Sequence, residues 1–261
     1  MRSNTTQAVP AGQGPWGEEF LLTGHKWFFS APMCDGHLVL AKTRERGSTC
    51  FFVPRWREDG ERNSLVVRPL FGAFGPQSVA ELQLSAASGY LLGEEGQGAL
   101  TFRAAVSVLR LGRTLASCAL LRQALVQSLT QARGMKNIPA QPLLDSVLVD
   151  MALESEAALT LAMRLAQAFE RCDDAAADSI SPLELAWKHV MAPAAQFWVG
   201  RRAMEVTAET MEWAGSQGAL DSPQGQTLAR LFLAAPAQGR GEGMGNALCL
   251  QVLNALDRQK P

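Results

Sequence analysis

The sequence predicts an α+β protein with two domains: a small antiparallel β-domain, sheet or barrel, over residues 1–97 and a four-helix bundle over residues 98–261. Two observations predict this fold class. The first part alternates short apolar runs with turn-forming residues, whereas beyond Gly98 the apolar residues recur at a spacing of three or four. The chain has 261 residues, of which 47% are hydrophobic, so each part can form a core.

Four apolar runs in the first part have the length and composition of β-strands. They are LVLAK at 38–42, TCFFV at 49–53, SLVVRPL at 64–70 and VAELQL at 79–84. The links between these runs contain turn-forming residues, among them Asp59-Gly60, and are too short to hold a crossover helix. We therefore expect neighbouring strands to run antiparallel.

The second part begins with two long helical patterns. Residues 98–133 predict a first helix, and the apolar stripe that runs from Leu144 to Phe169 predicts an amphipathic second helix. The first of these segments holds five arginines and no acid, and residues 139–178 hold eight acids against two arginines. Either the two segments are complementary neighbours in one bundle, or some arginines bind the phosphates of a dinucleotide or coenzyme A. Position in the sequence does not separate these alternatives.

A third helix has the clearest start in the chain. Ser181, Pro182 and Glu184 fit an N-cap, a first-turn proline and a capping-box glutamate. This helix is expected to reach Gly215, with a kink at Pro193. A short helix at 226–234 and a last helix at about 243–257 complete the predicted bundle.

Composition excludes several classes of protein. With 24 Lys and Arg against 25 Asp and Glu, the chain has no overall field for nucleic acid or an anionic membrane. Its apolar runs are interrupted by arginines, so we expect none to cross a membrane, and the first residues lack a secretory signal. A soluble, cytoplasmic protein is therefore expected. Five scattered cysteines and three histidines without a ligand motif predict reduced thiols and no metal site.

Three segments resemble one family. LTGHKWFFSAPMCDGHLVLAKT at 22–43 resembles the middle β-domain of the acyl-CoA dehydrogenases, most closely their DNA-alkylation-response branch. GYLLGEEGQG at 89–98 is similar to the family's passage into its helical domain, and GEGMGNALCLQVLNAL at 241–256 resembles its final loop and helix. The resemblance implies an FAD enzyme. A carboxylate removes the α-proton of an acyl-CoA thioester, and a hydride passes from the β-carbon to the flavin between sheet and bundle.

The resemblance also assigns roles to residues near the end of the chain. Glu242 matches the catalytic carboxylate, and Asn246 falls where the family contacts FAD. The glycines around Glu242 permit a close approach of backbone to ligand, although a solvated glutamate on a surface loop has the same composition. A turn or cap role is the alternative for Asn246.

Five further residues match cofactor positions in the family. Phe28 and Ser30 correspond to an aromatic ring beside the flavin and a hydroxyl near its N5, and strand alternation puts them on one face. Ordinary sheet core is the alternative for the aromatic run. Arg133, Gln141 and Gly215 match groups near the FAD pyrophosphate and adenosine. Their alternatives are a helix-end charge, a helix N-terminal side chain and a helix C-cap.

The chain also departs from the family pattern. The N-terminal helical domain and its TE..GSD segment are not in this sequence, and GMKNIPA replaces a Phe-Gly element after Arg133. Ala214 replaces one glycine of a pair, and Leu233 stands where an arginine is expected. The expected protein is thus an N-terminally truncated acyl-CoA dehydrogenase or one completed by a partner chain, and an inactive interaction or structural subunit is the alternative.

The family also implies partners. These are an acyl-CoA substrate, an electron-transfer flavoprotein as electron acceptor, and a homo- or hetero-oligomer formed through the bundle. The DNA-alkylation-response branch carries a basic helical extension associated with DNA, and this chain ends at Arg258-Gln259-Lys260-Pro261. Nucleic-acid binding is therefore not expected.

Overall fold

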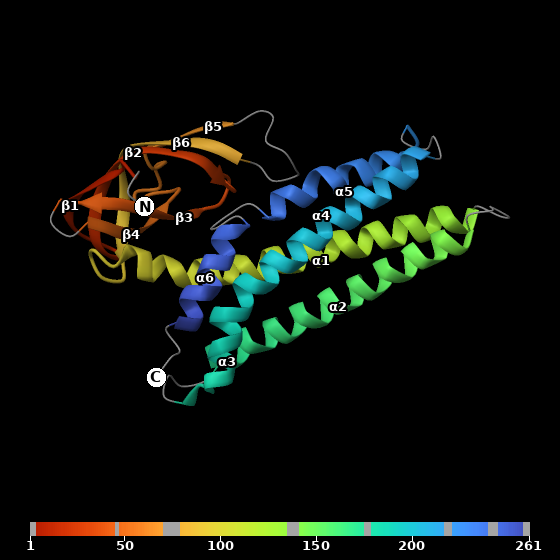
Figure 1. Cartoon of the computed structure of the whole chain (residues 1–261). Helices are drawn as coiled ribbons and strands as arrows, with labels where there is room; N and C mark the ends of the chain where they lie inside the picture. The colour runs from red at the N-terminus through yellow and green to blue at the C-terminus, as the bar shows by residue number, and fades with distance from the viewer. Residues whose placement is uncertain are drawn as a thin grey trace. The chain divides into compact units, whose positions relative to one another are not determined.

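The structure is a computed structural model of the chain. It describes residues 4–44, 47–69, 79–134, 141–174, 179–216, 221–239 and 245–257. The chain divides into two compact units, residues 1–106 and 107–261, and each is considered by itself (Figure 1). The predicted fold class is confirmed, since a six-stranded sheet precedes a set of helices.

The sheet of the first unit closes on itself. Its strands are β1 (Gln7–Gly14), β2 (Gly17–Ser30), β3 (Gly36–Thr43), β4 (Gly47–Pro54), β5 (Leu65–Pro69) and β6 (Val79–Leu92). The order is β2-β1-β3-β4-β6-β5, and an additional β2–β6 pairing joins the two sides into a barrel-like ring. Among the described strands, all pairs are antiparallel except β1–β3, which is parallel at Gln7 and Lys42 and involves a strand outside the predicted runs.

The core of the first unit comes from strand alternation. Phe20 and Leu22 on β2 face Phe51 and Val53 on β4, together with Leu82 and other apolar side chains of this cluster. Phe20 and Leu22 are two residues apart on β2, and Phe51 and Val53 are two residues apart on β4. The two side chains of each pair therefore point to the same side of the sheet. The apolar runs predicted as strands therefore supply part of this core, through Phe51, Val53 and Leu82, whereas Phe20 and Leu22 lie outside those runs.

The second unit is helical. Its elements are α1 (Gly98–Gly134, which begins in the first unit), α2 (Gln141–Asp174), α3 (Pro182–Ala186), the π-helical turn η2 (Trp187–Met191), α4 (Ala192–Ser216), α5 (Pro223–Gly239) and α6 (Asn246–Asp257). Figure 1 shows α1 and α2 as an antiparallel hairpin and α4 and α5 as a second one. Leu121 of α1, Ala162 of α2 and Val199 of α4 are fully buried in the shared core.

The predicted third helix is interrupted. Its irregularity lies at η2, directly before the predicted kink at Pro193, because proline lacks the N–H that would bond to residue 189 and its ring crowds that carbonyl. The helix starts as predicted, with Ser181 at the N-cap and Pro182 in the first turn, but the predicted capping box does not form, because the Ser181 side chain makes no capping hydrogen bond. Arg164 and Arg171 bind the Glu184 carboxylate instead.

The expectation that no apolar segment is long enough to cross a membrane is corrected for α1. Gly98–Arg133 contains an 18-residue window of mean hydropathy 1.4, so this helix is long and apolar enough to cross a membrane by length and composition. Core helices of soluble proteins meet the same criterion. Among the described residues, all five cysteines are free thiols, and no group of three or more His, Cys, Asp or Glu side chains is placed to hold a metal ion.

Candidate functional site

A β-bulge at Phe28 distorts the strand that carries the predicted flavin residues. The pairing of β2 with β6 shifts register between Lys26, opposite Leu82, and Phe29, opposite Ala80. Phe28 falls in this shift and has a φ of 54°, a left-handed conformation that costs a non-glycine residue about 1–2 kcal/mol. The bulge interrupts the strict alternation on which the shared face of Phe28 and Ser30 was predicted.

Two aromatic rings point away from the core, Trp27 by the alternation of β2 and Phe28 because of the bulge. Trp27 is 59% exposed and Phe28 is 55% exposed, and their rings meet edge to face with centroids 5.6 Å apart. Only Phe29 packs against the core, so ordinary sheet core is the wrong description of Trp27 and Phe28. Ser30, the last residue of β2, is also exposed. The structure therefore gives an outward aromatic pair followed by an outward hydroxyl.

Lys26, two residues before Phe28, was not predicted as a site residue. Its Nζ donates hydrogen bonds to the Leu40 carbonyl at 2.7 Å and to Asn4 Oδ1 at 2.8 Å. Asn4 Nδ2 donates to the same Leu40 carbonyl at 2.7 Å. Burial lowers the pKa of Lys26 from 10.5 to about 8. This cluster ties β2 to β3 beside the bulge, and it depends on contacts between residues far apart in the sequence.

Phe29 rests on a buried histidine. Its ring meets His37 edge to face at 4.9 Å, and His37 is buried on β3. Burial lowers the pKa of His37, the charge of Arg55 lowers it further, and Asp35 acts in the opposite direction. The lowered pKa favours the neutral imidazole of His37. The ring of Phe29, which follows the bulge, therefore packs against an uncharged side chain.

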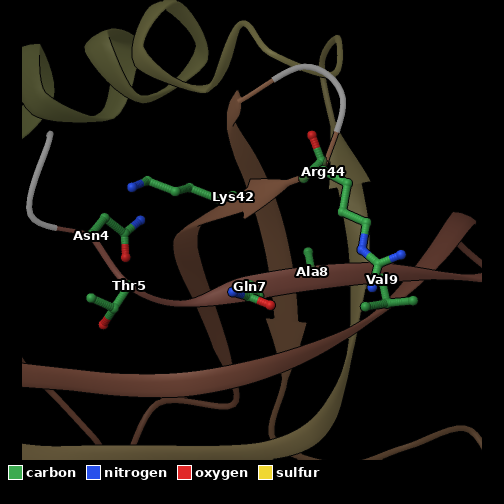
Figure 2. A pocket seen from close by; sticks show the side chains of 8 residues that line it. Asn4, Thr5, Gln7, Ala8, Val9, Lys42 and Arg44 are labelled. Carbon is green, nitrogen blue, oxygen red and sulfur yellow. The ribbon is translucent and has the colours of Figure 1, made fainter.

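A separate cavity of about 540 Å³ opens at the start of the first unit. Among the described residues, its wall contains Lys42 and Arg44 and no acid, but Figure 2 shows the two cationic side chains extending to opposite sides. The described part of the wall contains none of the sequence-predicted site residues. The lining residues are Asn4, Thr5, Gln7, Ala8, Val9, Lys42, Thr43 and Arg44. Because its cations do not converge, the cavity does not form a site for one anion.

Three predicted residues lie where the helices of the second unit are joined. Arg133 is exposed in the last turn of α1, and Gln141 is the first residue of α2, with a side chain outside the described set. Gly215 is the last residue but one of α4 and is half-buried. Figure 1 shows the end of α1, the start of α2 and the end of α4 at the same end of this unit. The structure therefore brings these three positions to one end.

Asn246 lies elsewhere in the second unit. It is the exposed first residue of α6, and the carbonyl of Gly245 before it accepts hydrogen bonds from Leu248 and Cys249. Gly245 has a φ of 47° and holds the position before the helix, so Asn246 does not cap α6. α6 contacts α1 through the Arg110–Gln251 hydrogen bond. That contact is 23 residues, about 34 Å along a helix, from Arg133.

Glu242, the predicted base, lies outside the described residues. Its position in the sequence is between Gly239, where α5 ends, and Asn246, where α6 begins. The structure therefore does not test its role. Among the predicted site residues that the structure describes, Phe28 and Ser30 lie in the first unit. The second unit contains Arg133, Gln141, Gly215 and Asn246.

The chain belongs to the acyl-CoA dehydrogenase family. A family model for the acyl-CoA dehydrogenase C-terminal domain matches residues 96–256, which is more than half of the sequence. Acyl-CoA dehydrogenases are FAD-dependent oxidoreductases that act on CH–CH groups. The resemblance predicted from three sequence segments is thus confirmed.

The relatives are longer than this chain. The putative acyl-CoA dehydrogenase AidB of Escherichia coli (strain K12) is 38% identical over 265 residues, which cover 99% of this chain and 46% of AidB. A solved structure of Caenorhabditis elegans ACDH-11 in complex with C11-CoA matches with a TM-score of 0.84 and 23% identity, over 98% of this chain and 44% of that one.

A second solved structure, an acyl-CoA dehydrogenase complexed with FAD from Bacillus anthracis, matches with a TM-score of 0.78 and 18% identity. It is matched over 99% of this chain and 45% of its own length. This chain therefore spans less than half of each of these three relatives. The two structural matches support the fold.

Proposed function

We propose that this chain supplies the β-domain and the C-terminal helical domain of an FAD-dependent acyl-CoA dehydrogenase. The outward bulge at Phe28 is the observation that carries the proposal. A strained residue that turns an aromatic ring away from an available core has a cost, and such strain is typical of ligand-binding positions. The position is also the one that the family resemblance assigns to the ring beside the flavin.

The described residues fit a flavin dinucleotide in chemical type. Phe28 offers a ring for stacking and Ser30 a hydroxyl, and Arg133 offers an exposed guanidinium suited to a pyrophosphate. FAD would supply the redox chemistry by accepting a hydride from the substrate's β-carbon. In this proposal Phe28 and Ser30 hold the isoalloxazine end, while Arg133, Gln141 and Gly215 hold the pyrophosphate and adenosine end.

The reaction also needs a base. We assign this role to Glu242, which would take the α-proton of the acyl-CoA thioester. Proton removal requires donors around the developing enolate oxygen and a site from which water is excluded, because desolvation raises the proton affinity of the carboxylate. The chain spans less than half of its relatives. We propose that the remaining walls come from sequence outside these 261 residues, in the same polypeptide or a partner.

The placement of the cofactor residues favours an oligomer. Arg133 lies about 34 Å along α1 from the contact with α6, the helix that Asn246 begins. One dinucleotide that contacts one of these ends does not reach the other. We therefore propose that a second chain, identical or related, brings Arg133, Gln141 and Gly215 to the FAD whose other end lies near Asn246 of the first.

Partners outside the oligomer follow from the same proposal. The substrate would be an acyl-CoA thioester, and an electron-transfer flavoprotein would reoxidise the cofactor. We propose a cytoplasmic location. The net charge of −1 gives no overall attraction to nucleic acid, so we propose no nucleic-acid partner.

One observation favours a second candidate function, an inactive interaction or structural subunit. Leu233, at the position where the family resemblance expects an arginine, is 51% exposed on α5 and offers no charge. A site that lacks this cation has a weaker electrostatic attraction for pyrophosphate. This candidate predicts a stable bundle without flavin.

Flavin titration followed by reduction with acyl-CoA tests the two functions. The active candidate predicts a bound FAD spectrum and bleaching by acyl-CoA in the presence of the remaining domain. Glu242→Gln should retain FAD and abolish bleaching, and the exposed Glu209→Gln on α4 is the matched control. Loss of FAD from Glu242→Gln would contradict its role as base. Failure of wild-type protein to bind added FAD would favour the inactive candidate.

A further inference from the structure

Two residues at the end of β2 hold a left-handed backbone conformation without being glycine. Phe28 has a φ of 54°, and Ala31, the first residue after β2, has a φ of 51°. Each costs free energy, because the Cβ atom crowds the following carbonyl oxygen in that conformation. Such residues persist only where the surrounding structure leaves the chain no alternative. The contacts around residues 28–31 are therefore the ones that hold the bulge in place.

Two contacts hold the part of β2 up to Phe29. Lys26 Nζ donates a hydrogen bond to the Leu40 carbonyl of β3 at 2.7 Å. The Phe29 side chain packs against the core of the first unit. Both contacts act on residues that precede Ala31. The constraint that keeps Ala31 left-handed therefore comes from another part of the molecule.

Arg55, the first residue after β4, contacts the loop that follows the bulge. This loop, residues 31–35, joins β2 to β3 and is called here the β2–β3 loop. Arg55 Nη1 donates a hydrogen bond to the Met33 carbonyl at 2.8 Å. The backbone N–H of Arg55 donates to the Asp35 carbonyl at 2.7 Å. One residue thus binds the β2–β3 loop at two carbonyl groups, one near its middle and one at its end.

The backbone of Arg55 is itself fixed to the sheet. Asn63 is 5% exposed, and its Nδ2 donates hydrogen bonds to the carbonyls of Pro54 at 2.8 Å and Ser88 at 2.7 Å. Asn63 Oδ1 accepts from the Ser88 N–H at 2.9 Å, and the Asn63 N–H donates to the Arg55 carbonyl at 3.0 Å. Because Ser88 belongs to β6, these bonds tie Pro54 and Arg55 to that strand. The Arg55 side chain therefore starts from a fixed base.

The side chain of Arg55 is also restricted in direction. Its guanidinium carbon lies 6.0 Å from the centre of the Trp56 ring, and Arg62 lies 5.2 Å from the same ring. The attraction between a guanidinium and an aromatic face favours this stacked arrangement. Burial lowers the pKa of His37, and the Arg55 charge lowers it further, which favours the neutral ring against which Phe29 packs. Arg55 thus acts on the residues before and after the end of β2.

We propose that Arg55 is a positioning residue for the flavin end of the site. Its guanidinium holds the β2–β3 loop through the Met33 carbonyl, and this contact keeps Phe28 left-handed and its ring turned outward beside the Ser30 hydroxyl. The inference rests on the proposed function, in which Phe28 and Ser30 hold the isoalloxazine end of FAD. Arg55 acts through these two residues and does not touch the cofactor. Without the guanidinium, residues 28–31 relax toward extended conformations.

Denaturant unfolding of the purified 261-residue chain tests the coupling between Arg55 and Phe28 without FAD. Glycine is favoured over alanine at position 28 only while φ is positive. The folding equilibrium constant of Phe28→Gly should therefore exceed that of Phe28→Ala by about fivefold, and Arg55→Met should abolish this difference. Arg57→Met is the matched control, because Arg57 lies in the same turn and pairs with Asp59, and it should leave the difference intact. A fivefold difference that persists in Arg55→Met overturns the proposal.

The β2–β3 loop gives a second readout. The Cys34 N–H donates a hydrogen bond to the Ala31 carbonyl at 3.1 Å, so its exchange with solvent reports whether the loop is held. Arg55→Met should speed this exchange at least tenfold, whereas Arg57→Met should not change it. Arg55→Lys keeps a charged donor and should restore most of the protection. Thermal unfolding checks that each variant is folded. Unchanged exchange at Cys34 in Arg55→Met overturns the proposal.

Flavin titration then connects the loop to the cofactor. Arg55→Met should weaken FAD binding at least tenfold in the wild-type background and no more than threefold in the Phe28→Ala background, because the ring that Arg55 positions is then absent. Arg55→Lys should recover most of the affinity. Equal weakening in both backgrounds overturns the positioning role. If the wild type binds no added FAD, the proposed function fails, and the two measurements without FAD still decide whether Arg55 holds the bulge.

Discussion

Arg164 and Glu184 form a two-pronged ion pair that joins α2 to α3. Arg164 Nη1 and Nη2 lie 2.9 and 3.1 Å from the two carboxylate oxygens, and Arg171 adds a third contact at 2.7 Å. The Arg164 guanidinium also lies 4.5 Å from the centre of the Trp187 ring. The carboxylate thus anchors the irregular segment that leads through η2 into α4.

The first prediction concerns acid stability. Hydrogen bonds from Arg164, and then from Arg171, hold the pKa of Glu184 below its ordinary value of 4.5. A lowered pKa in the folded state contributes stability that is present above pH 4.5 and is lost as the pH falls through the lowered value. Glu184→Gln should lower the unfolding temperature by several degrees at pH 7 and flatten the loss of stability below pH 4.5. Glu209→Gln should show the same dependence of unfolding temperature on pH as the wild type. If Glu184→Gln and Glu209→Gln lose stability equally in acid, the loss does not come from Glu184.

The second prediction separates strain from ring chemistry at Phe28. Because φ is 54°, Phe28→Gly should be more stable than Phe28→Ala by about 1 kcal/mol in denaturant unfolding, since glycine carries no Cβ penalty. Both substitutions remove the ring and should weaken FAD binding to a similar extent. Equal stability of the two variants would show that the left-handed conformation is not retained in solution.

The third prediction concerns Lys26, whose pKa is lowered to about 8 by burial. Between about pH 8 and its ordinary value of 10.5 the unfolded chain binds more protons at this residue than the folded chain, so this group makes the protein more stable as the pH rises. Lys26→Met should remove that rise, measured as urea unfolding at pH 7.5, 9 and 10. Lys42→Met, on an exposed lysine of β3, is the control. If the free energy of unfolding of Lys26→Met rises with pH as steeply as that of the wild type, a group other than Lys26 causes the rise.

Local signals predicted much of this fold, and long-range contacts explain what they missed. Strands β3 to β6 and helices α1 and α2 follow from periodicity, whereas β1, with the sequence QAVPAGQG, has proline and glycine and no apolar alternation. Glu184 has the spacing of a capping box, but two arginines from α2 bind it more strongly than one backbone N–H. Phe28 was predicted as a cofactor residue from the family resemblance of the chain, and its left-handed φ has no signal in the local sequence. Lys26 was missed because its environment is made by Asn4 and Leu40, which come from other segments.

The last prediction uses two glycines of the first unit. Gly24 lies on β2 at a register shift, with a φ of 156°, and a Cβ there would come within 2.6 Å of the Thr6 backbone. Gly12 has a φ of 123° and open space around it. Gly12→Ala should therefore cost about 1 kcal/mol from conformation alone, whereas Gly24→Ala should cost about 1–3 kcal/mol more, because β1 and β2 must separate. Denaturant unfolding of the two variants measures the difference. Equal costs would mean that the segment before β1 does not pack on β2 as described, and the Lys26–Asn4 hydrogen bond would then be lost as well.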